Sequence, residues 1–150
     1  MSVWSNIAYL IAGLLLWETP FISMSMIALG ITSALAHAKG GWYWKLDWAS
    51  MWLVFSAIAL HPLGLSYLAV IFALIGYKYG VDNYIAFSFV WALSVLSAHL
   101  SGVAVLLPIS IFAVALASQL YAESEYGTKT YEIFHSIWHV LTAIAIYVLV

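Results

Sequence analysis

Long uncharged stretches, interrupted only by short polar breaks, restrict this chain more than any other feature of its sequence. Hydrophobic residues make up 66% of its 150 residues and charged residues 7%, whereas a soluble domain carries about 25% charged residues. Apart from Glu18, the charges gather within 39–47, 78–82 and 123–132. The stretches between these clusters are long enough to cross the hydrocarbon core of a bilayer as helices. We therefore expect an integral membrane protein embedded in the bilayer.

Seven apolar runs divide the sequence into candidate transmembrane helices. They fall at 3–17, 20–38, 46–60, 63–79, 84–99, 102–121 and 131–150. Each lies near the lower end of the about 17–25 residues that a membrane-spanning helix needs. Gly, Pro or charged residues mark the breaks, as at 18–20 and 80–83. The predicted fold is an all-α membrane protein with one domain, 1–150, built as a compact bundle of seven short transmembrane helices with minimal loops.

The lysines indicate how the predicted bundle is oriented. With seven spans, the N-terminus and the loops after the second, fourth and sixth helices share one side of the membrane. All the lysines belong to those loops, namely Lys39, Lys45, Lys78 and Lys129, and cytoplasmic loops carry an excess of Lys and Arg. We expect a multi-pass protein of the cell membrane with a cytoplasmic N-terminus and an external C-terminus. Nearby aromatic residues are expected to anchor the same face: Trp42, Tyr43, Trp44, Trp48, Tyr77 and Tyr79.

Charge and cysteine content exclude several classes of function. A net charge of −2 without any arginine leaves no basic patch of the kind that binds nucleic acid, so no nucleic-acid partner is expected. The chain contains no cysteine, which rules out disulfides, thiolate metal ligands and thiol nucleophiles. Any metal ion must therefore be held by His, Asp or Glu. The other acidic residues are expected as solvated charges in loops or at helix starts: Glu18, Asp82, Glu123, Glu125 and Glu132.

Ionisable residues inside membrane spans are costly and usually functional, and four of those in the predicted spans stand out. His37 ends the second span, Asp47 opens the third, and His135 and His139 lie in the first half of the seventh. Tracing the chain up and down across the membrane places all of them on the lysine side, in one layer of the bundle. Residues scattered at random over seven spans would seldom share a layer, so we expect these to form a site.

The spacing of the histidines predicts a metal centre. His135 and His139 are four residues apart and therefore lie one above the other on a helix face, where both imidazoles can reach a single ion. His37 would complete a three-histidine set with an open fourth position, the arrangement of catalytic zinc. Calcium and magnesium prefer oxygen ligands. We expect Zn²⁺, although iron, copper or nickel also accept imidazole ligands.

Two further polar residues are candidates for catalysis. Ser33 lies four residues before His37 and so on the same helix face, one turn deeper in the bundle, where its hydroxyl can reach a metal-bound water. The structural alternative is a bond to the carbonyl group of Leu29. Asp47 can accept the proton of that water or orient a ligand imidazole. The structural alternative for Asp47 is an N-cap or an ion pair with Lys45.

The combination of these residues resembles a known family. Ser33-x-x-x-His37, the following Asp47 and His135-x-x-x-His139 on the last helix are similar to the motifs of the CREST superfamily of membrane hydrolases. This superfamily includes alkaline ceramidases and adiponectin-receptor-like proteins. The motif order, the helices that carry each motif and the seven-span count all agree, so the resemblance covers nearly the whole chain.

The resemblance extends to the first helix and implies a function. Ser5-Asn6 looks like the Ser-Asn pair that alkaline ceramidases carry there. By this resemblance the three histidines would bind zinc. Ser33 and Asp47 would assist the bound water in hydrolysing an amide of a membrane lipid, with release of a fatty acid. The predicted cytoplasmic N-terminus is more like the adiponectin-receptor branch.

Two other interpretations stay open. The chain can be a lipid-responsive, adiponectin-receptor-like protein or a transporter, in which zinc only ties the second and seventh helices together; a closed shell of four ligands without water would favour this. It can also be a bis-histidine haem protein, because His61 and His99 end two helices on the face opposite the lysines. For these two histidines we expect interfacial side chains, since His61 precedes the helix-breaking Pro62.

Overall fold

The computed structural model describes residues 3–79 and 84–150, with side chains from 88 onward in the second range. Every regular element in this part of the chain is a helix. Three short 3₁₀-helices, η1 (Val3–Asn6), η2 (His61–Leu63) and η3 (Ser66–Leu68), accompany α1 (Ile7–Leu15), α2 (Pro20–Lys39), α3 (Tyr43–Leu60), α4 (Ala69–Tyr79), α5 (Tyr84–Leu100), α6 (Leu106–Ser124) and α7 (Lys129–Leu149). The prediction of an all-helical chain with seven helices is confirmed for the described residues.

The observed helix boundaries differ from the predicted ones where the backbone turns. The fourth predicted span was to begin at 63, but α4 begins at Ala69, because Pro62 and Gly64 shape the connection after α3. Gly64 has a φ of 69°, a left-handed conformation that side-chain-bearing residues avoid. Gly102, with a φ of 85°, likewise makes a turn before α6, which therefore starts at Leu106 rather than 102. The predicted break at 80–83 lies outside the described residues.

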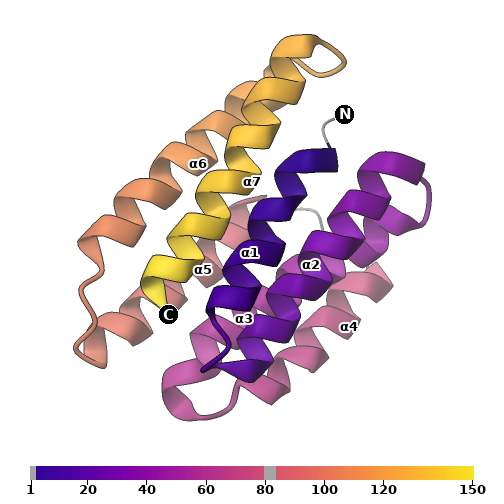
Figure 1. Ribbon diagram of the computed structural model, residues 1–150. Helices are drawn as coiled ribbons and strands as arrows, with labels where there is room; N and C mark the ends of the chain where they lie inside the picture. The colour runs from indigo at the N-terminus through magenta and orange to yellow at the C-terminus, as the bar shows by residue number, and fades with distance from the viewer. Residues whose placement is uncertain (1–2, 80–83) are drawn as a thin grey trace.

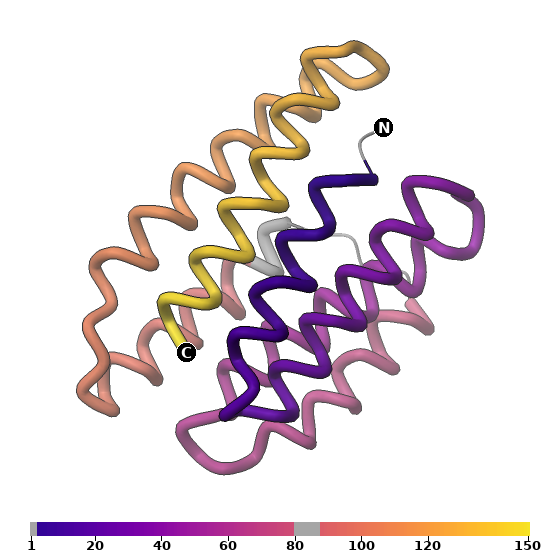
Figure 2. Tube along the Cα trace, in the orientation of Figure 1, coloured from indigo at the N-terminus to yellow at the C-terminus, as the bar shows by residue number. Residues whose placement is uncertain are grey.

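The helices pack so that the first and last parts of the chain are neighbours. α1 lies between α2 and α7, α6 packs along α7, and α3 packs against α2, α4 and α5 (Figures 1 and 2). The N-terminus and the turns α2–α3 and α6–α7 lie toward one end of the molecule, whereas the turns α1–α2 and α5–α6 lie toward the other (Figure 1). This up-and-down arrangement brings the end of α2, the start of α3 and the start of α7 to the same end.

Aromatic side chains form the centre of the core. Trp91 of α5 stacks on Phe112 of α6 with ring centroids 4.5 Å apart, and Phe55 of α3 meets both rings edge-on. Trp138 of α7 packs against Phe112 at 5.8 Å. Offset-stacked and edge-to-face ring pairs stabilise by about 0.5–1.5 kcal/mol beyond their buried area. This cluster fixes the position of α7, which carries two of the candidate ligands.

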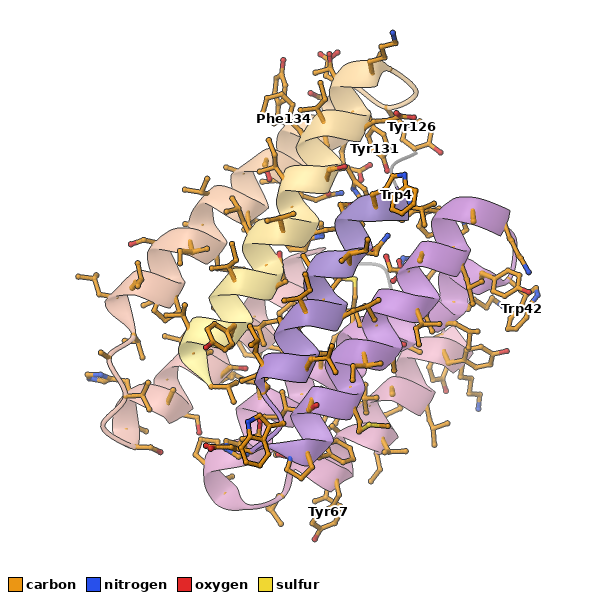
Figure 3. All side chains as sticks on the ribbon, viewed as in Figure 1. Trp4, Trp42, Tyr67, Tyr126, Tyr131 and Phe134 are labelled. Atoms are coloured by element: carbon orange, nitrogen blue, oxygen red, sulfur yellow. The ribbon has the colours of Figure 1, made fainter. Side chains whose placement is uncertain are left out.

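Length and surface character indicate a membrane protein. The segments Pro20–Lys39, Tyr43–Leu63, Leu106–Ser124 and Lys129–Leu149 are 19 to 21 residues long and apolar enough to cross a bilayer. The segments Val3–Leu15, Ser66–Tyr79 and Ser88–Leu100 are apolar but shorter. Many large apolar side chains point outward (Figure 3), including Leu14, Leu74 and Leu106, which are 66%, 64% and 78% exposed. An apolar surface of this extent suits contact with lipid rather than water.

Candidate metal centre

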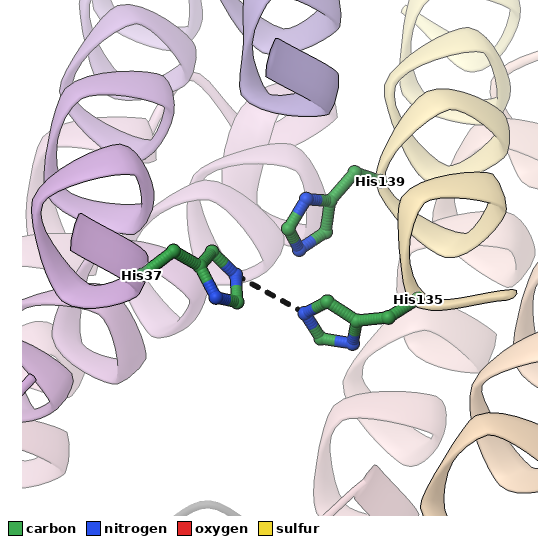
Figure 4. Close-up of side chains that lie close together, drawn as sticks. All are labelled: His37, His135 and His139. Carbon is green, nitrogen blue, oxygen red and sulfur yellow. Dashed lines mark hydrogen bonds between the residues drawn. The ribbon is translucent and has the colours of Figure 1, made fainter. Parts of the chain in front are cut away.

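Three histidines from the two ends of the chain converge between α2 and α7 (Figure 4). His37 lies in the last turn of α2, and His135 and His139 lie one turn apart on α7. Nε2 of His37 is 3.1 Å from Nε2 of His135, and one ring nitrogen of each histidine lies within 4.8 Å of the others. His139 is only 4% exposed, and the other two rings are half-buried. The structure thus brings together all three histidines singled out as ligands.

This geometry fits one metal ion. Metal–imidazole bonds of about 2.0–2.1 Å at tetrahedral angles place two ligand nitrogens about 3.3 Å apart. The 3.1 Å separation between His37 and His135 is close to that value, and a small inward movement of His139 completes the set. Neutral imidazoles packed this closely face lone pairs toward one another unless a proton or a cation lies between them. Three convergent nitrogen donors can therefore hold a metal ion.

A buried amide orients the His135 ring. Oε1 of Gln119, on α6, lies 2.8 Å from Nδ1 of His135, and the amide nitrogen of Gln119 donates to Glu123 at 2.6 Å. Tyr131, one turn earlier on α7, stacks on the same imidazole with an interplanar angle of 15°. No sequence motif singled out Gln119; the available signal was an amide within an otherwise apolar helix. The expectation that Glu123 is a loop charge is wrong, because it lies in the last turn of α6.

A serine from the other end of the chain orients the His139 ring. Oγ of Ser5, in η1, lies 3.0 Å from Nδ1 of His139. Tyr9 of α1 packs against the same ring with centroids 5.6 Å apart. With Nδ1 occupied, the Nε2 atom of His139 is left for the cluster. The Ser5-Asn6 pair, noted in the sequence for its resemblance to a family motif, therefore contacts the site directly through its serine.

Two tryptophans of the predicted aromatic belt line the site. Trp44 meets the His37 ring edge-on with centroids 5.0 Å apart, and Trp44 and Trp48 both line the cavity beside the histidines. Their positions in the first turns of α3 direct them inward. Trp42 is 55% exposed and stacks on Tyr43 with ring centroids 4.3 Å apart, and the interfacial role of this pair stays a prediction.

Ser33 and Asp47 form a buried pair next to the histidines. Their side chains are hydrogen-bonded to each other, and they are only 2% and 6% exposed. Asp47 is the fifth residue of α3, whose N-cap is Trp42, so the alternative interpretation of Asp47 as an N-cap is wrong. Oδ1 of Asp47 is buried and has no hydrogen-bond partner among the described residues. A buried carboxylate oxygen without a partner is costly and indicates a missing ligand.

Two pockets that share lining residues adjoin the site. The inner cavity of about 30 Å³ is lined by Ser33, Asp47, His135 and His139, among others. One water needs about 10–15 Å³, so this cavity accommodates a metal ion with one or two small ligands. The outer groove of about 460 Å³ shares Trp44, Trp48 and His135 with the inner cavity. Its remaining walls include Lys45, Glu123, Tyr126 and Tyr131, of which the two tyrosines lie at the upper end in Figure 3.

The two other histidines lie away from this centre. His61 belongs to η2 at the end of α3, and His99 lies in the last turn of α5. Both are exposed, and among the described residues neither joins a cluster of metal-ligating side chains. The interfacial role expected for these two histidines stays a prediction.

Comparison with protein-family models, with curated proteins and with solved structures gives no match.

Proposed function

We propose that this chain is a zinc-dependent intramembrane hydrolase that cleaves an amide of a membrane lipid and releases a fatty acid. One observation carries the proposal: two histidines of the three-histidine cluster, His135 and His139, line the same cavity as the hydrogen-bonded Ser33–Asp47 pair. The resemblance of these residues to CREST motifs supports the reaction class. A metal site that only ties helices together does not require a buried carboxylate oxygen without a partner, and Oδ1 of Asp47 is such an atom among the described residues.

The donor set favours zinc over other common ions. Three imidazole nitrogens without any thiolate suit zinc, whereas calcium and magnesium require oxygen-rich shells. When bound, zinc lowers the pKa of its water toward about 7 and polarises the carbonyl group under attack. Asp47 and Ser33 line the cavity that His135 and His139 also line, so both would be available to a water molecule bound to the ion.

The polar pair supplies the proton transfers of amide hydrolysis. Asp47 takes one proton from the attacking water on Oδ1, the oxygen without a partner. The Ser33 hydroxyl donates to the Asp47 carboxylate and holds it in place before the attack. Once Asp47 carries the proton, this hydroxyl is released to donate to the oxygen that gains charge in the transition state. Asp47 then returns the proton to the leaving amine, so that one water and one amide yield a carboxylic acid and an amine.

The outer groove provides the route for substrate. An inner cavity of about 30 Å³ cannot contain a lipid, so only the reacting bond enters it. The groove of about 460 Å³ offers aromatic walls and one residue of each charge, Lys45 and Glu123, for the polar end of the lipid. With seven spans and a cytoplasmic N-terminus, this opening lies at the cytoplasmic membrane surface. The acyl chain of the substrate stays in the bilayer.

The test combines metal analysis with hydrolysis assays on the purified full chain in detergent. We expect one zinc per chain and release of fatty acid from N-acyl amides offered alongside the corresponding esters. His139→Ala removes a ligand and should abolish both zinc binding and hydrolysis. Asp47→Asn keeps the ligand set and should retain zinc but lose about 100-fold or more of the hydrolysis rate, the usual effect of losing a general base.

Ser136→Ala is the matched control on α7. Its hydroxyl donates only to the carbonyl group of Glu132 within the same helix, so zinc content and hydrolysis should match the wild type. Full hydrolysis by His139→Ala would contradict the site assignment. A zinc-loaded protein that hydrolyses neither amides nor esters would instead favour the lipid-responsive protein in which zinc joins α2 and α7.

A further inference from the structure

A hydrogen-bonded chain leads from the surface of α6 to the back of the His135 ring. Glu123 is exposed on the last turn of α6, and Gln119, one turn earlier, is fully buried at 0% exposure. The amide nitrogen of Gln119 lies 2.6 Å from Oε1 of Glu123, and its amide oxygen lies 2.8 Å from Nδ1 of His135. All three side chains are therefore linked in series.

The donors and acceptors in this series of hydrogen bonds can be arranged in only one way. A carboxylate accepts hydrogen bonds, so the group of Gln119 that faces Glu123 must be the NH₂ donor. Its carbonyl oxygen then faces His135 and can only accept, which requires the proton of the neutral imidazole to reside on Nδ1. The lone pair is consequently on Nε2 of His135, the atom that lies 3.1 Å from Nε2 of His37. Glu123 thus determines the orientation of the amide, and the amide determines the tautomer of the ligand.

Packing alone does not account for an amide at this position. Burial of an amide without partners costs about 1–3 kcal/mol in proteins, and an apolar side chain of similar volume avoids that cost. The neighbours of Gln119 on α6 include the buried Ala115 and Ala122, both at 0% exposure. Tyr131 already supports one face of the His135 ring by stacking, but stacking leaves the choice of tautomer open. The amide supplies the missing restraint at the ring edge.

We propose that Gln119, held in place by Glu123, is the positioning residue that makes His135 a metal ligand. This inference rests on the proposed metal centre and deepens it. Outer partners that accept from a ligand imidazole fix its tautomer and raise its basicity, and their loss typically lowers metal affinity about 10–100-fold. Glu123 acts through the amide of Gln119, from which its carboxylate accepts a hydrogen bond.

The test uses the full chain in detergent, with zinc as the probe. Gln119→Met removes the acceptor with little change in volume and should lower zinc affinity, measured by competition with a chelator, about 10–100-fold. In the double variant Gln119→Glu, Glu123→Gln the two side chains are exchanged. A carboxylate oxygen at position 119 can then accept from His135, and an amide at position 123 can donate to that carboxylate. This variant should restore zinc affinity. Ser118→Ala is the control on α6, because that buried hydroxyl donates only to the carbonyl group of Ala115.

A second readout does not depend on metal. In metal-free protein labelled with ¹⁵N-histidine, the His135 signals should show a protonated Nδ1 and an unprotonated Nε2, and Gln119→Met should shift the ring toward the other tautomer. His135→Gln assigns the signals by removing them. Thermal unfolding of each variant checks that the chain remains folded.

The outcomes separate this inference from the proposed function. Unchanged zinc affinity and an unchanged tautomer in Gln119→Met, with or without a lower melting temperature, would overturn the positioning role while leaving the metal centre intact. Absence of zinc binding by the wild-type protein would contradict the proposed function. The ¹⁵N signals would still decide whether Gln119 sets the tautomer of His135.

Discussion

At the scale of single residues, the candidate metal centre depends on the three histidines and also on the residues that contact the Nδ1 atoms of two of them. His135 contacts Gln119 and His139 contacts Ser5, each through Nδ1. Both imidazoles thereby present Nε2 toward His37, which comes from a different helix. A histidine whose ring is free to rotate loses conformational entropy on metal binding, whereas a ring already held by a partner does not. These contacts preorganise the cluster.

Ser5→Ala tests this preorganisation at His139. Loss of the 3.0 Å contact to Nδ1 should lower zinc affinity about 10–100-fold, because the ring loses the partner that fixes its tautomer. Ser5→Thr keeps the hydroxyl and should retain affinity near that of the wild type. Ser25→Ala is the control, a buried serine that donates to the carbonyl group of Phe21 on its own helix. Equal affinities in Ser5→Ala and Ser25→Ala would refute the role of Ser5.

At the scale of helices, close packing of α1 against α2 positions Ser5. Gly13 of α1 faces α2 so closely that a Cβ atom there would lie 2.9 Å from the carbonyl oxygen of Ser23. The Ser23 hydroxyl donates to the Gly13 carbonyl group at 2.7 Å across the same interface. Small residues that let backbones approach are typical of helix pairs in membranes. η1 continues directly into α1, so displacement of α1 would also move Ser5.

Gly13→Ala should therefore destabilise the protein. Alanine gains at most about 1 kcal/mol in helix propensity over glycine, whereas a forced overlap with backbone costs about 1–3 kcal/mol. We expect a lower midpoint of thermal unfolding in detergent, followed by tryptophan fluorescence, together with weaker zinc binding. Ile11→Val is the control, because Ile11 is 53% exposed on the same helix. An unfolding midpoint at or above the wild-type value would show that α1 accommodates the extra methyl group.

At the scale of the whole molecule, the number of membrane crossings decides on which side the groove opens. Among the described residues, four segments have the length to cross a bilayer, and three apolar helices are shorter. In a seven-span arrangement, the start of α1 and the α2–α3 turn lie on the same side. If only the four long segments crossed, α2 alone would separate those two points and place them on opposite sides.

Cysteine labelling distinguishes the two arrangements, because the chain contains no cysteine of its own. Trp4→Cys, Trp42→Cys and Tyr67→Cys place single thiols at positions that are 78%, 55% and 59% exposed. With a membrane-impermeant maleimide on intact cells and on inverted vesicles, seven spans predict that Trp4→Cys and Trp42→Cys react from the cytoplasm. Tyr67→Cys should react from outside. Labelling of Trp4→Cys and Trp42→Cys from opposite sides would exclude the seven-span arrangement.

The sequence by itself determined the helices and the layer of the ligands, because both depend on short-range patterns. Runs of apolar residues, Gly and Pro punctuation and the i, i+4 spacing of His135 and His139 are local properties of the chain. Up-and-down tracing then placed His37 and Asp47 beside them, since successive short helices alternate in direction. The predicted starts of α4 and α6 were too early, because turns that contain glycine occupy the residues just before these helices.

Only the tertiary structure decided which partners complete the centre. Ser5 is 134 residues from His139 in the chain, and Gln119 is 16 residues from His135 on another helix. That Trp44 lines the cavity could not be predicted for the same reason. These contacts depend on the rotation and close approach of helices, which arise from packing across the whole bundle. Residue spacing within one helix carries no information about them.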